Sequence, residues 1–205
     1  MDFYNDLMKN IQTMKIMEEK NIGNENVVKY YEYFDNKEEF AIVIELCDYS
    51  FLNYFIRNKM SFNINEIYDL LLQLNNTFKI IIENKIYHGN INLDNIFIKE
   101  DTNKKLIYKL SNNYYLGERY IDLFCDNINY MAPEIIEAGK YDGRSDLWSL
   151  GVLIYCLFFK KFPFRGRNML VILNDIKHGK ELAKTGNDNL DDLISRLLIE
   201  EKKKE

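Results

Sequence analysis

Side chains that could do chemistry gather between Tyr87 and Ile98, where the sequence reads YHGNINLDNIFI. The segment carries one imidazole and three amides that bear on a possible site: His88, Asn90, Asn92 and Asn95. An asparagine amide is neutral, so it can donate and accept hydrogen bonds but cannot take up a proton. None of these three asparagines can therefore act as the general base of a proton transfer. The asparagines could instead serve only to hold the loop together by hydrogen bonds. Under that interpretation too, the site would be inert.

This segment resembles the catalytic loop of the eukaryotic protein kinases, H-R-D-L-x-x-x-N, with His88 and Asn95 at matching positions. The resemblance places Asn90 where the family has the aspartate that accepts the proton of the substrate hydroxyl. It places Asn92 where the family has a lysine that steadies the transferred phosphate. Gly89 stands where the family has an arginine that pairs with a phosphorylated activation loop.

Other motifs are similar to kinase motifs and occur in the family's order. They are NENVVKYY at 24–31, IVIELC at 42–47, YMAPE at 130–134, SDLWSLG at 145–151 and FPF at 162–164. No single one is specific, but their ordered spacing identifies the chain as a member of the protein kinase family. The APE and SDLWS segments resemble Ser/Thr kinases more than Tyr kinases.

The resemblance also shows which catalytic groups are absent. The metal-binding triplet of the family, D-F-G, here reads Asn112-Asn113-Tyr114. Asn95 and Asn112 thus hold the positions of the family's Mg²⁺ ligands, although hard divalent cations prefer carboxylates. The sequence has no G-x-G-x-x-G and no V-A-I-K, and residues 12–15 contain no acid where the family has a helix glutamate. We therefore interpret the chain as truncated at its N-terminus and degenerate at its catalytic positions.

The expected nucleotide pocket is altered as well. The resemblance assigns Glu45 and Cys47 to the hinge and Phe97 to the floor of the adenine pocket, where the family usually has leucine. A phenylalanine is bulkier and fills part of the site. We expect no cofactor, and ATP with Mg²⁺ only if the chain is an active kinase after all.

Apolar periodicity and turn residues predict the elements that position these residues. The expected helices are 3–20, a long helix through 64–82 that Ser61 could cap, a helix from Pro133, a core helix at 146–159, and 170–178 and 190–199. The expected strands form hairpins at 27–34 with 40–46 and at 96–98 with 106–110. The prediction is an α+β, kinase-like fold. Residues 1–47 would form a remnant small lobe, and 48–205 a mostly helical large lobe without its final helix.

Composition limits the remaining choices. The 205 residues suit one domain, and 47% apolar content supports a sizeable core. A net charge of −5 argues against nucleic-acid and membrane partners. Three distant cysteines and two histidines do not suggest a zinc site, and reduced thiols are typical of a cytoplasmic protein. The apolar run 147–159 is too short to span a membrane, and no signal peptide is recognisable.

Three functions stay open at this point. The chain is a pseudokinase whose fold binds a protein partner, or an active Ser/Thr kinase with unusual catalytic residues, or a gene fragment without a selected function. In the second case another chain would supply the missing lobe, and Asp94 could replace the base. In the first, the two-stranded hairpin leaves open edges, so we expect 27–34 or 40–46 to pair with another chain of unknown identity, or else the protein to be poorly soluble.

Overall fold

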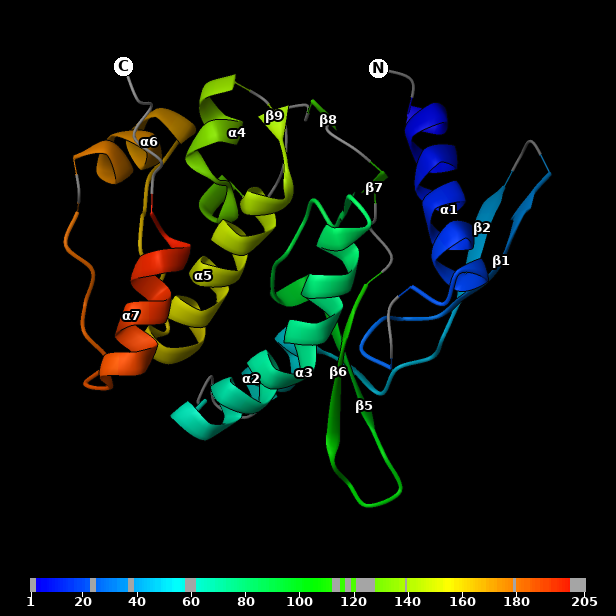
Figure 1. Ribbon diagram of the computed structural model, residues 1–205, viewed down its shortest axis with the longest axis horizontal. Coiled ribbons are helices and arrows are strands. Elements are labelled where there is room, and N and C mark those ends of the chain that lie inside the picture. The colour runs from blue at the N-terminus through cyan, green and yellow to red at the C-terminus, as the bar shows by residue number, and fades with distance from the viewer. Residues whose placement is uncertain are drawn as a thin grey trace.

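The structure is a computed structural model that describes residues 3–22, 25–36, 39–57, 62–111, 115–116, 119–120, 128–138, 140–178 and 180–199. Figure 1 shows one helix and a β-hairpin at one end of the molecule, a central helix beside a second hairpin, and the C-terminal helices at the other end. Helices and small sheets together form an α+β arrangement. Among the described helices, none is both long enough and apolar enough to cross a membrane.

The N-terminal end consists of helix α1 (Phe3–Glu19) and the antiparallel strands β1 (Tyr30–Asp35) and β2 (Phe40–Ile44). The helix and the hairpin confirm the sequence prediction, although both strands are shorter than expected. Helix α1 turns Ile11, Met14 and Met17 into the core, each at most 3% exposed. These residues follow the steps of three that place side chains on one helix face.

The central sheet has three strands in the order β3 (Tyr49–Ser50), β5 (Ile96–Glu100) and β6 (Leu106–Leu110). The β5–β6 hairpin was predicted, whereas β3 and the following helix α2 (Phe51–Arg57) were not. A parallel bridge joins Val27 to Leu110. The sheet therefore fastens the segment before β1 to the middle of the molecule.

Helix α3 (Ile64–Glu83) packs on β6 and on α5. Its N-cap is Asn63, whose side chain accepts from the backbone of Asn65 and Glu66 while Glu66 reaches back to the Asn63 N–H. This reciprocal pair is a capping box. The suggested cap, Ser61, lies outside the described residues, and Asn63 is the cap observed.

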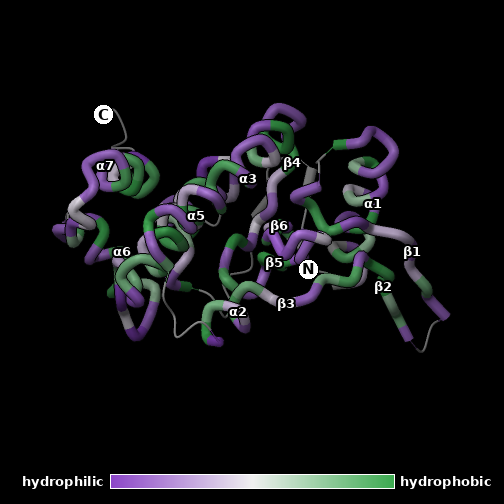
Figure 2. Tube along the Cα trace, turned by 90° about the horizontal axis from the view of Figure 1, so that it is seen from below, coloured by the Kyte–Doolittle hydropathy of each residue, from purple (hydrophilic) through white to green (hydrophobic). Residues whose placement is uncertain are grey.

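Helix α5 (Gly143–Phe159) lies between α3 and α7 (Figures 1 and 2) and is buried along most of its length. It begins three residues before the predicted Asp146, because Asp142 caps it. At Gly151 an added Cβ would lie 2.8 Å from the Cβ of Leu197 in α7, so only glycine allows this approach. The remaining elements are β4 (Ile86–Tyr87), η1 (Leu93–Asn95), β7 (Tyr115–Leu116), β8 (Arg119–Tyr120), η2 (Ile128–Tyr130), α4 (Pro133–Ala138), β9 (Lys140–Tyr141), α6 (Met169–Lys177) and α7 (Asp188–Leu197).

Candidate functional site

One carboxylate, from helix α5, holds the backbone of the loop that follows β4. Asp146, in the first turn of α5, accepts hydrogen bonds from the backbone N–H of His88 at 2.8 Å and of Gly89 at 3.0 Å. The Tyr141 hydroxyl donates a third hydrogen bond to Asp146. Asp146 is fully buried, and this burial raises its pKa to about 6 even though the three hydrogen bonds act to lower it. Gly89 has a φ of 78°, a left-handed conformation that glycine adopts without strain.

His88 is a structural residue in this arrangement. Its side chain is fully buried, and desolvation lowers its pKa to about 3, so the ring is neutral near pH 7. Its Nδ1 accepts from the backbone N–H of Asn90, which places the ring proton on Nε2, 3.3 Å from the Ser111 hydroxyl. A buried neutral imidazole with both nitrogens engaged is poorly suited to exchange protons with a bound substrate.

The three asparagines of the loop bind one another. The Asn92 amide donates to Oδ1 of Asn90 at 2.7 Å, and the Asn95 amide donates to the backbone carbonyl of Asn90 at 2.9 Å. The Asn92 carbonyl oxygen accepts from the backbone N–H groups of Asp94 and Asn95 and so caps η1. The structure therefore brings Asn90, Asn92 and Asn95 together as an amide network without an ionised member.

This network offers little to a divalent cation. Mg²⁺ is usually bound through one or two carboxylates. Oδ1 of Asn90 accepts one hydrogen bond from Asn92, and the side-chain oxygen of Asn95 is the other amide oxygen on offer, so the network presents a cation with neutral amide oxygens instead of carboxylates. Across the described part of the chain, no group of three His, Cys, Asp or Glu side chains could hold a metal ion. The described loop residues do not fit a magnesium triphosphate, and Asn112, the other suggested ligand, lies outside the described residues.

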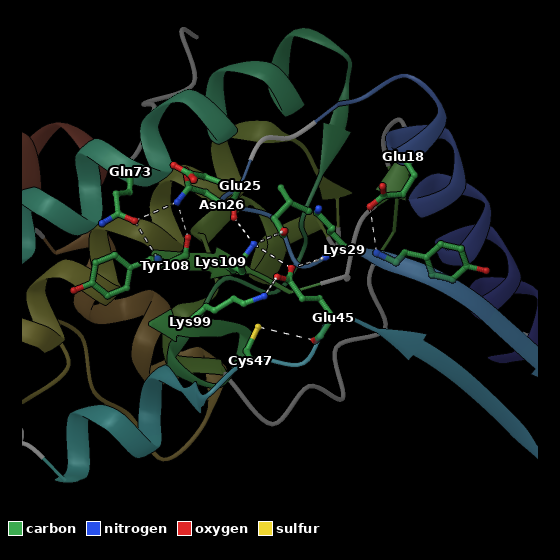
Figure 3. Close-up of polar contacts among 12 residues, drawn as sticks. Glu18, Glu25, Asn26, Lys29, Glu45, Cys47, Gln73, Lys99, Tyr108 and Lys109 are labelled. Atoms are coloured by element: carbon green, nitrogen blue, oxygen red, sulfur yellow. Dashed lines mark hydrogen bonds and ion pairs between the residues drawn. The ribbon is translucent and has the colours of Figure 1, made fainter. Parts of the chain in front are cut away.

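The carboxylate of the suggested hinge residue Glu45 forms ion pairs with two lysines (Figure 3). Its two oxygens pair with Nζ of Lys99 at 2.6 Å and Nζ of Lys109 at 3.0 Å. Burial raises the pKa of Glu45, but hydrogen bonds from Lys99 and Lys109 outweigh it, so the pKa is lowered on balance. The Glu45 and Lys109 side chains are only 7% and 4% exposed. Glu45 therefore anchors the base of the hairpin.

Lys109 does more than neutralise Glu45. Its ammonium group also donates to the backbone carbonyls of Glu25 and Val27, in the segment that leads into β1. Sequence reasoning missed this residue, although a lysine within the apolar strand LIYKL signals a buried partner. A cavity of about 610 Å³ adjoins the ion pair, and its lining includes Glu45, Lys99 and Lys109.

The other suggested pocket residues do not share this cavity. Its lining contains neither Cys47 nor Phe97. Cys47 is half-buried, its Sγ lies 4.0 Å from the carbonyl oxygen of Glu45, and burial raises the pKa of its thiol. Phe97 is also half-buried, in the middle of the sheet, opposite Ser50 of β3 and Lys109 of β6. Glu45 and Cys47 are thus adjacent, while Phe97 lies on a different element.

Comparison with known proteins gives a consistent result. The sequence model described as "Protein kinase domain" matches residues 4–204. The probable serine/threonine-protein kinase KIN1 homolog of Enterocytozoon bieneusi is 28% identical over 176 residues, which cover 85% of this chain and 30% of the relative. NUAK family SNF1-like kinase 2 of Homo sapiens is 28% identical over 176 residues, 85% of this chain and 28% of the relative. Calcium-dependent protein kinase 5 of Plasmodium falciparum is 30% identical over 208 residues, 92% of this chain and 35% of the relative.

The chain therefore spans about a third of the length of these curated relatives. The match of the family model covers nearly the whole sequence, from the first turn of α1 to the last residues. On this evidence the chain belongs to the protein kinase domain family.

Proposed function

We propose that this kinase domain is catalytically inactive and serves as a protein-binding module. The observation that carries the proposal is the closed amide network of Asn90, Asn92 and Asn95. Asp146 holds the backbone of that loop through two N–H groups, so the scaffold is kept. The side chains at the proton-accepting and phosphate-steadying positions are neutral.

The size of the expected loss supports inactivity. Removing a general base typically slows a reaction about 10²–10⁴-fold. Removing a charge-stabilising group costs about 10²–10³-fold. These losses are not additive when residues act as a unit. Even so, replacing Asp with Asn at the base position and Lys with Asn two residues later leaves little room for useful turnover.

A phosphotransfer assay tests the proposal directly. Purified protein is incubated with labelled ATP, Mg²⁺ or Mn²⁺, and a general protein substrate, and its melting temperature is recorded with and without nucleotide. We expect neither phosphotransfer nor a nucleotide-dependent rise in melting temperature. The Asn90→Asp variant is the matched control, because it returns a carboxylate in the same shape, and we expect it to stay inactive. Turnover by the unmodified protein would contradict the proposal.

An active Ser/Thr kinase is the second candidate. The relatives reported above are named as kinases, and the exposed Asp94 lies within the same loop. If Asp94 is the base, Asp94→Asn abolishes turnover, whereas Asn90→Ala does not. This pair of variants separates a substitute base from a contaminating kinase, because a contaminant would be unaffected by both.

The hairpin supplies a candidate contact for the partner. Strands β1 and β2 form a two-stranded sheet in the part of the chain that the structure describes. Its outward residues include Tyr31 and Phe34 of β1, 58% and 55% exposed, and Ile44 of β2 at 39%. Exposed apolar side chains on a sheet with open edges favour the addition of a further strand. A monodisperse monomer with rapid amide exchange along β2 would argue against this contact.

A further inference from the structure

A second cavity lies far from the asparagine loop in sequence, between two connecting segments near the C-terminal helices. It measures about 530 Å³, within the range of about 300–1,000 Å³ that is usual for ligand sites. One wall comes from residues 161–165, just after α5, and the other from residues 180–184, between α6 and α7. In Figure 1 the connection from α6 to α7 runs down the left margin of the molecule. We call this site the basic cavity.

The lining of the basic cavity is strongly biased in charge. It contains four basic residues and one acid: Lys161, Arg165, Lys180, Lys184 and Glu181. The surplus of three positive charges stands out on a chain whose net charge is −5. Such a patch attracts acidic ligands and repels basic ones.

Two of these cations form no ion pair with a described residue. Lys180 pairs with Asp175 at 2.8 Å, and Lys184 lies close enough to Asp191 to help lower the pKa of that carboxyl. Lys161 instead lies 6.0 Å from the centre of the Phe159 ring, and Arg165 has no ion pair with a described residue. Lys161 and Arg165, on the same wall, are therefore available to an incoming carboxylate.

The floor of the basic cavity is apolar and preformed. Tyr155 of α5 is 3% exposed, and its hydroxyl accepts a hydrogen bond of 3.4 Å from the backbone N–H of Ala183. Pro163 is buried, while Phe162 and Leu182 are half-buried. The Tyr155–Ala183 contact joins the floor to the wall formed by residues 180–184. An apolar side chain can thus enter between walls that carry cations at their rims.

We propose that the basic cavity binds an acidic peptide segment of a partner protein, with one apolar side chain on the floor and carboxylates on either side of it. All four cations are exposed and stand on two separate segments. This spread suits an extended chain with several charges better than a compact anion, which needs converging, desolvated donors. The proposal extends the protein-binding function proposed above, and peptide binding is measured independently of the phosphotransfer assay.

The test uses fluorescence polarisation with a labelled ten-residue peptide in which one phenylalanine is flanked by glutamates on both sides. A peptide with glutamine at each glutamate position is its control. We expect saturable binding of the acidic peptide that weakens with salt, and no binding of the glutamine peptide.

Two protein variants locate the site. Lys161→Glu with Arg165→Glu should weaken binding at least about tenfold, because two favourable charge contacts become repulsive. Lys20→Glu with Lys105→Glu makes the same change in net charge outside the cavity and should alter binding less than about twofold. If the first variant fails to fold, Arg165→Gln with Lys184→Gln should still weaken binding several-fold.

Three results would overturn the proposal: equal binding of both peptides, equal effects of the two charge-reversed variants, or displacement of the peptide by inorganic phosphate at matching concentration. The last would show a simple anion site. If the protein is inactive but does not bind the acidic peptide, the proposal for the basic cavity is wrong and the proposed function stands. If the protein binds the peptide but transfers phosphate, the cavity proposal stands and the proposed inactivity is wrong.

Discussion

Replacing Lys109 with methionine would remove the buried partner of the Glu45 carboxylate, whose side chain is only 7% exposed. Methionine is flexible and of similar length, so the change removes a charge with little loss of packing. Breaking a buried ion pair costs about 3–5 kcal/mol, since the remaining charge loses its partner without regaining water. Lys99 stays at 2.6 Å from the same carboxylate, so we expect the lower end of this range, about 3 kcal/mol.

Lys99 provides a matched control because it pairs with the same carboxylate and differs in burial. Its side chain is 42% exposed, against 4% for Lys109. An exposed pair contributes about 0–1 kcal/mol, so Lys99→Met should cost no more than about 1 kcal/mol. Free energies of unfolding from urea titrations at pH 7, followed by circular dichroism, would measure both.

A third variant separates the ion pair from the rest of the site. Glu45→Gln combined with Lys109→Met removes both charges, and we expect it to be less destabilised than the sum of the single changes by about 2 kcal/mol. The reasoning would be refuted if the two lysine variants had the same stability, or if Lys109→Met cost less than about 1 kcal/mol. Either result would mean that burial does not decide the strength of this pair.

Three further predictions concern His88, the cap of η1 and the cap of α3. Burial holds the pKa of His88 at about 3 instead of 6.5, so its neutral ring contributes stability above pH 6.5 that is lost as the pH falls toward 3. The stability difference between the protein and His88→Leu should therefore shrink by up to about 1.4 kcal/mol per pH unit when urea unfolding is repeated at pH 5. Asn92→Ala removes the cap of η1 and should cost about 1–2 kcal/mol, more than Asn90→Ala, in urea unfolding. Asn63→Ala should lower the stability by about 1 kcal/mol while Asn65→Ala is nearly neutral, and equal melting temperatures would contradict the observed capping box.

The long elements could be predicted because their signals are local. The apolar spacing of α3 and the mostly apolar run of β6 after the turn residues 101–103 can each be read from neighbouring residues. The cap of α3 was misplaced by two residues because serine and asparagine are both good caps. The correct choice was readable, since Asn63 is followed at the third position by Glu66, as a capping box requires.

The elements that were missed depend on tertiary contacts. Helix α2 has seven residues, which is too short for a clear period, and it is fixed by burial of Phe51 and Phe55. Strands β4 and β7 have two residues each and exist because they pair with one another. No propensity argument finds a two-residue strand without its partner.

The candidate site shows the same division. The asparagine loop was readable as a motif, because its members lie within six residues, Asn90 to Asn95. The amide network also arises within the loop. The ion pair of Glu45 with Lys109 joins the residue just after β2 to a residue of β6, and nothing near either residue in sequence identifies the other. The two walls of the basic cavity are likewise brought together only by the fold.

The end of strand β6 and the residue that follows it contact two parts of the candidate site within three residues, Lys109 to Ser111. Lys109 grips the base of the hairpin, while Ser111 donates its N–H to the carbonyl of Asn95 at 2.9 Å and contacts His88 through its hydroxyl. Because Lys109 and Ser111 are only two residues apart in an extended backbone, a displacement of one would be passed directly to the other. If a partner protein binds the hairpin as proposed above, a displacement of Lys109 would therefore act on the Asn90–Asn95 loop through Ser111.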